Sequence, residues 1–165
     1  MKKIRNIILF LIITFFSCKK KEEVKMNINE KFIREWESVK TIIPHKDYLL
    51  IKSDQTFEFH GGACTSFYES FGKWKVVNDT LILNSNKSKK CQYVNGFGDN
   101  FEAPKKDEIF ETKTTINNCN PENENCYVNF INDKFYIKND TLKYVTKIKL
   151  PFNITNDFLP RKKTL

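Results

Sequence analysis

The sequence predicts an all-β domain: an antiparallel β-barrel or sandwich with a short helical turn near its N-terminal end. Two observations carry this prediction. Stretches of alternating apolar and polar residues recur at short, regular intervals, and one hairpin pattern occurs twice. We expect a helical turn near 29–33, a first strand through Trp36, and further strands from Tyr48 onwards. Short strands joined by tight turns favour a barrel or a sandwich.

The best-defined hairpin turns at Asn78-Asp79. Asn and Asp tolerate the positive φ that two-residue hairpin turns require. The register that follows pairs Trp74 with Leu83 on one buried face. The same pattern, with Asn-Asp again at the turn, returns 61 positions later in 134–144. A single hairpin is not stable alone in water, so we expect both hairpins to belong to one larger sheet.

Two further breaks are expected along the chain. Gly61-Gly62 follows the alternating strand 56–60, and glycine pairs commonly end strands. Asn132-Asp133 precedes the second hairpin and is typical of a turn. We therefore predict that one strand ends at Gly61 and that the chain reverses at Asn132.

Seven aromatic residues are candidates for an apolar ligand pocket inside the barrel. They are Trp36, Phe57, Phe59, Trp74, Phe130, Phe135 and Tyr144. Apolar pockets are lined mainly by such side chains. An eight-stranded barrel is just wide enough to be filled by its own side chains or to hold one small ligand, and the sequence leaves both possibilities standing.

The first 17 residues predict a secretory signal peptide. A basic start with Lys2, Lys3 and Arg5 precedes an apolar run over 7–16. A membrane-spanning helix needs about 20 apolar residues, roughly twice this length. We therefore divide the chain into a signal peptide (1–17), a lipidated cysteine with a charged tether (18–28) and a single β domain (29–165).

Phe15-Phe16-Ser17-Cys18 resembles the lipobox of bacterial lipoproteins, in which the signal is cut just before a cysteine. In that family the cysteine carries a diacylglycerol and its new amino terminus is acylated, commonly with palmitate. The charged run 19–23 is similar to the export signals of Bacteroidetes-type surface lipoproteins. The resemblance implies that Cys18 anchors the protein to the outer membrane through lipid. An ordinary signal peptide with an incidental cysteine is the alternative.

Four cysteines remain after Cys18, and an even number in an oxidising compartment favours disulfides. The polar segment between Cys119 and Cys126 brings its own ends together, which favours that pair and leaves Cys64 with Cys91. Each bridge contributes about 2.5–3.5 kcal/mol by loop-closure entropy. The spacings lack the Cys-x-x-Cys pairs that zinc sites favour, so we expect no metal site.

The net charge of +8 does not indicate a nucleic-acid partner. The signal peptide holds three basic residues and no acidic one, which leaves 25 Lys and Arg against 20 Asp and Glu, or +5. That excess is spread over runs such as 87–90 and 161–163 rather than gathered with aromatics. We expect a membrane partner through the anchor and no nucleic acid.

The segments 49–57, Gly72-Lys73-Trp74 and Asp79-Thr80-Leu81 together resemble small bacterial lipocalin-like lipoproteins. Those proteins typically read as a strand, Asp-x-Thr-Phe, a strand, Gly-x-Trp and Asp-x-Leu. The resemblance spans roughly Trp36–Tyr144. It implies an up-and-down barrel that binds a small apolar ligand or a protein partner of the cell envelope. The alternative is a protein-binding accessory or inhibitor module with a packed barrel and functional loops.

The sequence shows no catalytic signature. His45 and His60 are the only histidines. Ser66 or Ser70 could be imagined in a catalytic triad with His60 and a carboxylate, but the sequence contains no Gly-x-Ser-x-Gly motif, which forms the nucleophile elbow. If His60 continues the alternation of the strand before it, its side chain points away from the buried face. We expect a non-enzymatic monomer without a cofactor.

Overall fold

The computed structural model describes residues 29–39, 45–63, 66–98, 113–145 and 156–161. The predicted signal peptide, Cys18, the tether and Cys64 lie outside the described residues. Within these ranges the chain forms a sheet of ten strands and one short 3-10 helix. No helix of the described ranges is long and apolar enough to cross a membrane.

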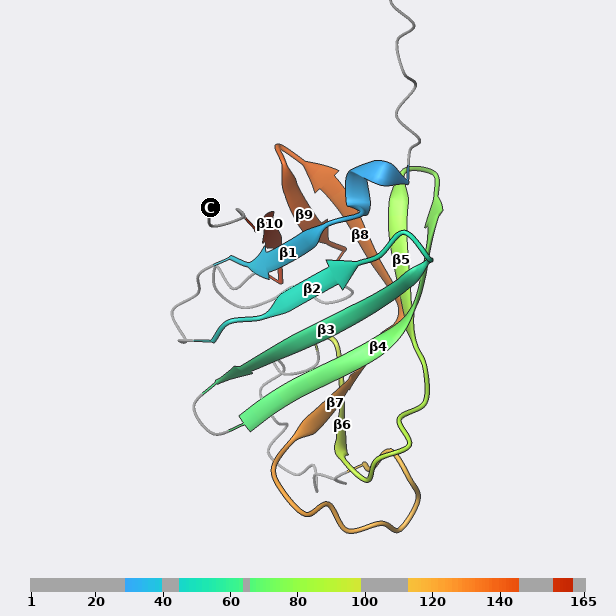
Figure 1. Cartoon of the computed structure of the whole chain (residues 1–165), viewed down its shortest axis with the longest axis vertical. Helices are drawn as coiled ribbons and strands as arrows, with labels where there is room; N and C mark the ends of the chain where they lie inside the picture. The colour runs from blue at the N-terminus through green and yellow to red at the C-terminus, as the bar shows by residue number, and fades with distance from the viewer. Residues whose placement is uncertain (1–28, 40–44, 64–65, 99–112, 146–155, 162–165) are drawn as a thin grey trace, which may run out of the picture.

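The elements follow one another along the chain as labelled in Figure 1. They are η1 (Glu30–Phe32), β1 (Glu35–Ser38), β2 (Tyr48–Ile51), β3 (Thr56–Ala63), β4 (Ser66–Val77), β5 (Thr80–Ser85), β6 (Tyr93–Gly96), β7 (Cys126–Asn129), β8 (Ile131–Lys138), β9 (Thr141–Tyr144) and β10 (Phe158–Pro160).

Eight of these strands close into a barrel. The ring runs β1-β2-β3-β4-β5-β8-β9-β10 and returns to β1, and every neighbouring pair is antiparallel. Apart from β6 and β7, each strand pairs with the next one along the chain, which is the up-and-down arrangement. The predicted all-β barrel is therefore confirmed. A closed ring leaves none of its own strands as an unpaired edge.

Both predicted Asn-Asp hairpins are present. Asn78 and Asp79 have φ values of 47° and 63°, and Asn139 and Asp140 have 50° and 56°. Such angles are tolerated by Asn and Asp because their short polar side chains bond locally. Trp74 lies opposite Leu83, as the sequence predicts.

The two other predicted breaks are wrong. β3 continues through Gly61 to Ala63, because Gly61 lies directly beneath the Asp47 side chain. A Cβ at Gly61 would lie 2.0 Å from Asp47 Oδ1, so the strand needs glycine there for close approach rather than for a break. Asn132 has a φ of 52° but serves as the extra residue of a β-bulge opposite Leu83 and Asn84. The chain continues in the same direction.

The barrel core is made of large apolar side chains that face inwards from every strand of the ring. At the end where η1 lies, Phe32 is fully buried and its carbonyl accepts a hydrogen bond of 3.0 Å from Trp36 Nε1. Trp74 Nε1 donates to the Lys52 carbonyl at 2.8 Å. A Cβ at Gly72 would lie 2.7 Å from the Phe57 ring and 2.1 Å from the Asn84 carbonyl oxygen, so this glycine lets β4 pack closely.

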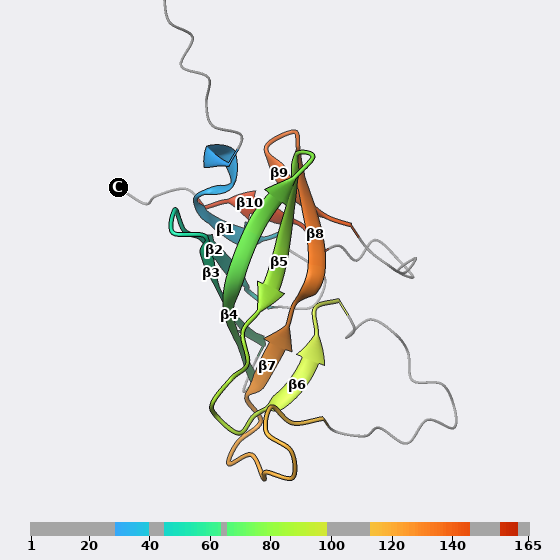
Figure 2. The same ribbon diagram turned by 90° about the vertical axis from the view of Figure 1, so that its right-hand side faces the viewer.

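β6 and β7 extend the sheet at the other end of the barrel, as Figure 2 shows. β5 ends at Ser85, whereas the first part of β4 continues beyond it. β7 lies beside this part of β4 and pairs in parallel with both β4 and β6. The chain then passes through Phe130 into β8. Ser85 Oγ accepts a hydrogen bond of 2.9 Å from the Phe130 amide and so fixes this junction.

Candidate functional site

The structure brings the seven predicted pocket residues together inside the barrel. Six of them are almost fully buried in one core cluster, and Tyr144 packs against that cluster. The Phe57 and Phe59 rings meet the Phe130 ring at centroid distances of 5.2 and 5.5 Å. Tyr144 also has a polar role, because its hydroxyl donates to Asp133 Oδ1 at 2.8 Å. These side chains therefore contact one another as a packed core does.

Phe97, which follows β6, adds a further ring to this interior. It stacks on Phe130 at 4.5 Å and meets Tyr144 edge-on at 5.0 Å. It also contacts the rings of Phe59, Phe135 and Phe158, at 5.9, 5.6 and 6.3 Å. Because four of these five rings belong to β3, β8, β9 and β10, Phe97 fills the space between opposite walls near the end where β6 and β7 lie.

The disulfide pairing differs from the predicted one. Cys91 is bonded to Cys119 with a Cα–Cα distance of 5.9 Å, and Cys126 is a free thiol. Both predicted pairs are therefore wrong. The reason is that Cys126 begins β7, where pairing with β4 and β6 holds its backbone, whereas Cys119 lies in the loop beside Cys91. Burial raises the pKa of the Cys126 thiol above its ordinary value, and the nearby Glu124 adds to this.

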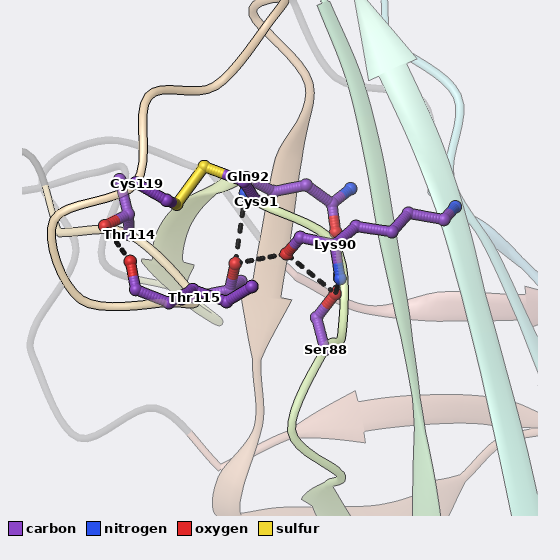
Figure 3. The surroundings of a disulfide bond; sticks show 8 residues. Ser88, Lys90, Cys91, Gln92, Thr114, Thr115 and Cys119 are labelled. Atoms are coloured by element: carbon purple, nitrogen blue, oxygen red, sulfur yellow. Dashed lines mark hydrogen bonds between the residues drawn. A yellow bond between two sulfur atoms is a disulfide. The ribbon is translucent and has the colours of Figure 1, made fainter.

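The disulfide ties two loops that border a groove on the outside of the barrel. Figure 3 shows Cys91 and Cys119 joined, with Thr115 between the loops. The Thr115 hydroxyl accepts a hydrogen bond of 3.0 Å from the Gln92 amide, and the Thr115 amide donates to the Gln92 carbonyl at 2.9 Å. These bonds and the disulfide fix the two loops against each other.

The groove has a volume of about 550 Å³ and is partly open to solvent. Ligand pockets generally have volumes of about 300–1,000 Å³. Its floor comes from the ends of β3 and β4, through His60, Gly61, Phe67, Tyr68 and Glu69. Its walls come from Lys90, Cys91 and Gln92 on one loop and from Asn120, Glu122, Asn123 and Asn125 on the other. None of the seven predicted pocket residues lines it.

A polar network joins Glu69 on the groove floor to Lys90 and Gln92 in one of the walls. Glu69 Oε1 accepts hydrogen bonds from Gln92 Nε2 at 2.8 Å and from Lys90 Nζ at 3.1 Å. Gln92 is 6% exposed, and its Oε1 accepts a bond of 2.9 Å from Ser88 Oγ. Burial alone raises the pKa of Glu69, but the bonds from Lys90 and Gln92 outweigh it and hold the pKa below its ordinary value. Glu69 is therefore an ionised, oriented acceptor.

Phe67 is the apolar element of the groove floor. Its side chain is 62% exposed, more than any other large apolar side chain described. Phe71 lies on the same outward face of β4 but packs edge-on against Tyr127 at 5.7 Å. Phe67 thus presents an aromatic ring to solvent inside a concave, otherwise polar surface.

Of the serine and histidine residues considered for catalysis, Ser70 and His60 do not come together. Ser70 is buried with its hydroxyl 2.8 Å from Ser85 Oγ, whereas His60 lies on the opposite, outward face of the sheet. His45 Nε2 lies 3.4 Å from Asp47 Oδ2. Burial raises the pKa of Asp47 although His45 opposes it. Among the described residues, no three His, Cys, Asp or Glu side chains gather to hold a metal ion.

Reasoning from the sequence missed both Phe67 and Phe97. A signal for Phe67 was present, because the alternation that turns Trp74 inwards turns residues 67, 71, 73 and 75 outwards. A phenylalanine on that face has no core to enter. Phe97 lies between Gly96 and Gly98 in a polar stretch, and no local pattern there indicates that its ring enters the barrel.

The fold and the groove define the class of protein to which this chain belongs: a small, closed up-and-down β-barrel with a concave surface outside it. Comparison of the chain with known protein families, with curated proteins and with solved structures found no match.

Proposed function

We propose that this protein is a non-enzymatic, lipid-anchored binding protein of the bacterial outer membrane, whose packed barrel presents the outer groove to a ligand or partner of the cell envelope. The barrel architecture suits a binding role. The basic start, the short apolar run and the lipobox-like Cys18 support export and lipid anchoring. The protein acts as a monomer without a cofactor, and it does not bind nucleic acid.

The observation that carries this proposal is the groove beside the Cys91–Cys119 disulfide. It combines an exposed ring, an oriented carboxylate and loop amides in one concavity. Binding sites commonly have this composition, an apolar surface with a few fixed polar groups. Two tethered loops also lose less conformational entropy on binding than free loops would.

The contacts inside the barrel favour the groove over the barrel interior as the binding site. Phe97 occupies the space between Phe59, Phe130 and Tyr144, so the aromatic residues predicted to line a pocket pack against one another. The barrel then acts as a rigid support. This arrangement corresponds to a packed module that binds through its loops.

Site-directed photo-crosslinking tests the proposed site. The full chain, made in bacterial cells, carries p-benzoylphenylalanine at Phe67 or, as a control, at Leu159. Leu159 is 46% exposed on β10, four strands from β4 in either direction round the ring. We expect a discrete crosslinked species at position 67 that is absent at position 159. Equal crosslinking at both positions, or none at position 67, contradicts the proposal.

Metabolic labelling tests the anchor independently. Cells supplied with an alkyne-bearing palmitate analogue are expected to label the wild-type chain and not the Cys18→Ala variant. The Cys126→Ala variant keeps Cys18 and is the matched control, which is expected to be labelled. Equal labelling of wild type and Cys18→Ala contradicts a lipid anchor at Cys18.

A further inference from the structure

We propose that the ligand of the outer groove is a saccharide, which stacks on Phe67, donates hydrogen bonds to the Glu69 carboxylate and exchanges hydrogen bonds with the side-chain amides of the loop 120–125. This inference rests on the proposed function, because it assigns a ligand class to the same groove. The groove lining, an exposed aromatic ring among polar side chains, matches a hydroxyl-rich molecule with apolar ring faces.

The ring of Phe67 is exposed within the groove. An aromatic side chain left in water within a groove gains free energy when an apolar surface covers it. The C–H faces of a pyranose ring are flat and apolar, whereas its rim carries hydroxyl groups. The exposed ring of Phe67 can stack on such an apolar face, and the polar walls around it can form hydrogen bonds with the hydroxyl groups.

Hydrogen-bonding side chains line the groove together with this ring. Asn120, Asn123 and Asn125 line the wall opposite Lys90, and each side-chain amide offers both a donor and an acceptor. A sugar hydroxyl is likewise both donor and acceptor. Asn123 Oδ1 already accepts a hydrogen bond of 3.0 Å from the backbone N–H of Asn125, which orders this part of the loop. Paired donors and acceptors on a fixed loop suit adjacent hydroxyls on one ring.

The carboxylate of Glu69 is oriented by its hydrogen bonds within the protein. Both hydrogen bonds that the described residues give to this carboxylate, from Lys90 and Gln92, end on Oε1. Oε2 is therefore the oxygen that a ligand hydroxyl would meet. Because Gln92 is buried and bonded to Ser88, the carboxylate is held by a second layer of contacts rather than by one mobile lysine.

The balance of charge and backbone pairing distinguishes a saccharide from other ligands. Lys90 is the only Lys or Arg among the described residues that line the groove, it forms an ion pair with Glu69 at 3.1 Å, and Glu122 adds a second carboxylate. The lining therefore carries no excess of Lys or Arg charge to attract a phosphate or an acidic polymer. A peptide that adds as a β-strand needs a free strand edge. β4 pairs with β3 on one side and, at Tyr68 and Glu69, with β7 on the other, so these two residues of the groove floor offer no such edge.

A glycan array followed by calorimetry tests the assignment. The full chain, purified in detergent, is applied to an array of bacterial, plant and animal oligosaccharides, and each bound sugar is then titrated in solution. We expect one group of related glycans to bind. The Phe67→Ala variant is expected to weaken that binding at least tenfold, whereas Phe67→Tyr, which keeps a ring, is expected to restore most of it.

The control variant is Leu159→Ala, which removes an exposed apolar side chain from the far wall and is expected to bind like wild type. An array without binding overturns the saccharide assignment, as does sugar binding that Phe67→Ala leaves unchanged. If position 67 nevertheless crosslinks a protein, the groove is still a binding site and only the ligand class is wrong. If position 67 crosslinks nothing as well, the proposed function also fails.

Discussion

The inside of the barrel and the groove on its outside both use phenylalanine, in opposite surroundings. Phe97 comes from a loop and contacts five aromatic rings, whereas Phe67 comes from a regular strand and is 62% exposed. Whether a phenylalanine lies in a loop or on a strand therefore does not decide whether its ring packs in the interior. The ring that is buried contributes to stability, and the ring that is exposed in a concavity is available for binding.

The two regions also differ in how they are held. The interior depends on apolar packing, with tryptophan N–H groups bonded to backbone carbonyls. The groove depends on a disulfide and on bonds among Thr115, Gln92 and Glu69. Substitutions should accordingly separate stability from binding.

Trp74→Ala is expected to lower the free energy of unfolding by about 3–5 kcal/mol, because it removes a buried indole and leaves the Lys52 carbonyl without its bond. Lys75→Ala, the next residue on the outward face of β4, is the matched control and is expected to change it by less than about 0.5 kcal/mol. Urea denaturation measures both. A loss below about 1 kcal/mol for Trp74→Ala would show that this side chain is not core.

Replacing Cys91 and Cys119 together by serine is expected to lower the free energy of unfolding by about 3.5 kcal/mol, from loop-closure entropy over their separation of 28 residues. Groove binding is expected to weaken as well, because both walls are freed. Peptide mapping of the alkylated wild-type chain provides the check: a Cys119–Cys126 crosslink would contradict the observed pairing and support the one predicted from the sequence.

The barrel could be predicted because its signals are local. Asn78-Asp79 with the flanking alternation specifies a turn, a register and a buried face, and its repeat specifies them again. The disulfide pairing could not be predicted, since it depends on where β7 docks. Cys126 and Cys119 are close in sequence, but parallel pairing with β4 holds Cys126 in the sheet, which no short-range pattern encodes.

The two predicted strand breaks, at Gly61 and Asn132, are likewise wrong because local sequence does not encode the tertiary contacts at these positions. Gly61 and Asn132 both permit unusual backbone geometry, but that property alone does not say whether a turn, a bulge or a close contact uses it. Asp47 lies over Gly61 only because β2 and β3 pair in one particular register. The groove likewise joins residues from three distant segments, so its existence follows from the tertiary structure.

Phe97→Ala is expected to lower the free energy of unfolding by about 2–3 kcal/mol, somewhat less than a fully buried phenylalanine because this side chain is only partly buried. It is also expected to open an apolar cavity between Phe59, Phe130 and Tyr144. Fluorescence titration with N-phenyl-1-naphthylamine measures that cavity. Strong binding of this probe by the wild-type chain, unchanged in the variant, would contradict a filled barrel.

Asp47 makes the stability of the barrel depend on pH. Burial raises its pKa in the folded chain above the ordinary value of 3.8, so the folded state holds the proton more tightly than the unfolded state does. The contribution of Asp47 to the free energy of unfolding is fully present below pH 3.8 and is lost as the pH rises through the pKa that Asp47 has in the folded chain. Urea denaturation at pH 4 and pH 7 is expected to show wild type losing stability relative to Asp47→Asn as the pH rises. A constant difference contradicts this.

Phe67→Ala is expected to change the free energy of unfolding by less than about 0.5 kcal/mol, because its ring is mostly in water. Thermal unfolding beside wild type measures the effect. A loss of more than about 2 kcal/mol would place Phe67 among the packing residues and remove the contrast with Phe97.

Native mass spectrometry of the full chain, purified from the cells that naturally make it, tests most directly whether binding occurs outside the barrel. With the barrel filled and the groove as the site, we expect no bound apolar molecule, and any bound ligand should be absent from Phe67→Ala. An apolar molecule that leaves on denaturation and is retained by Phe67→Ala would contradict the account, because it would place the ligand inside the barrel.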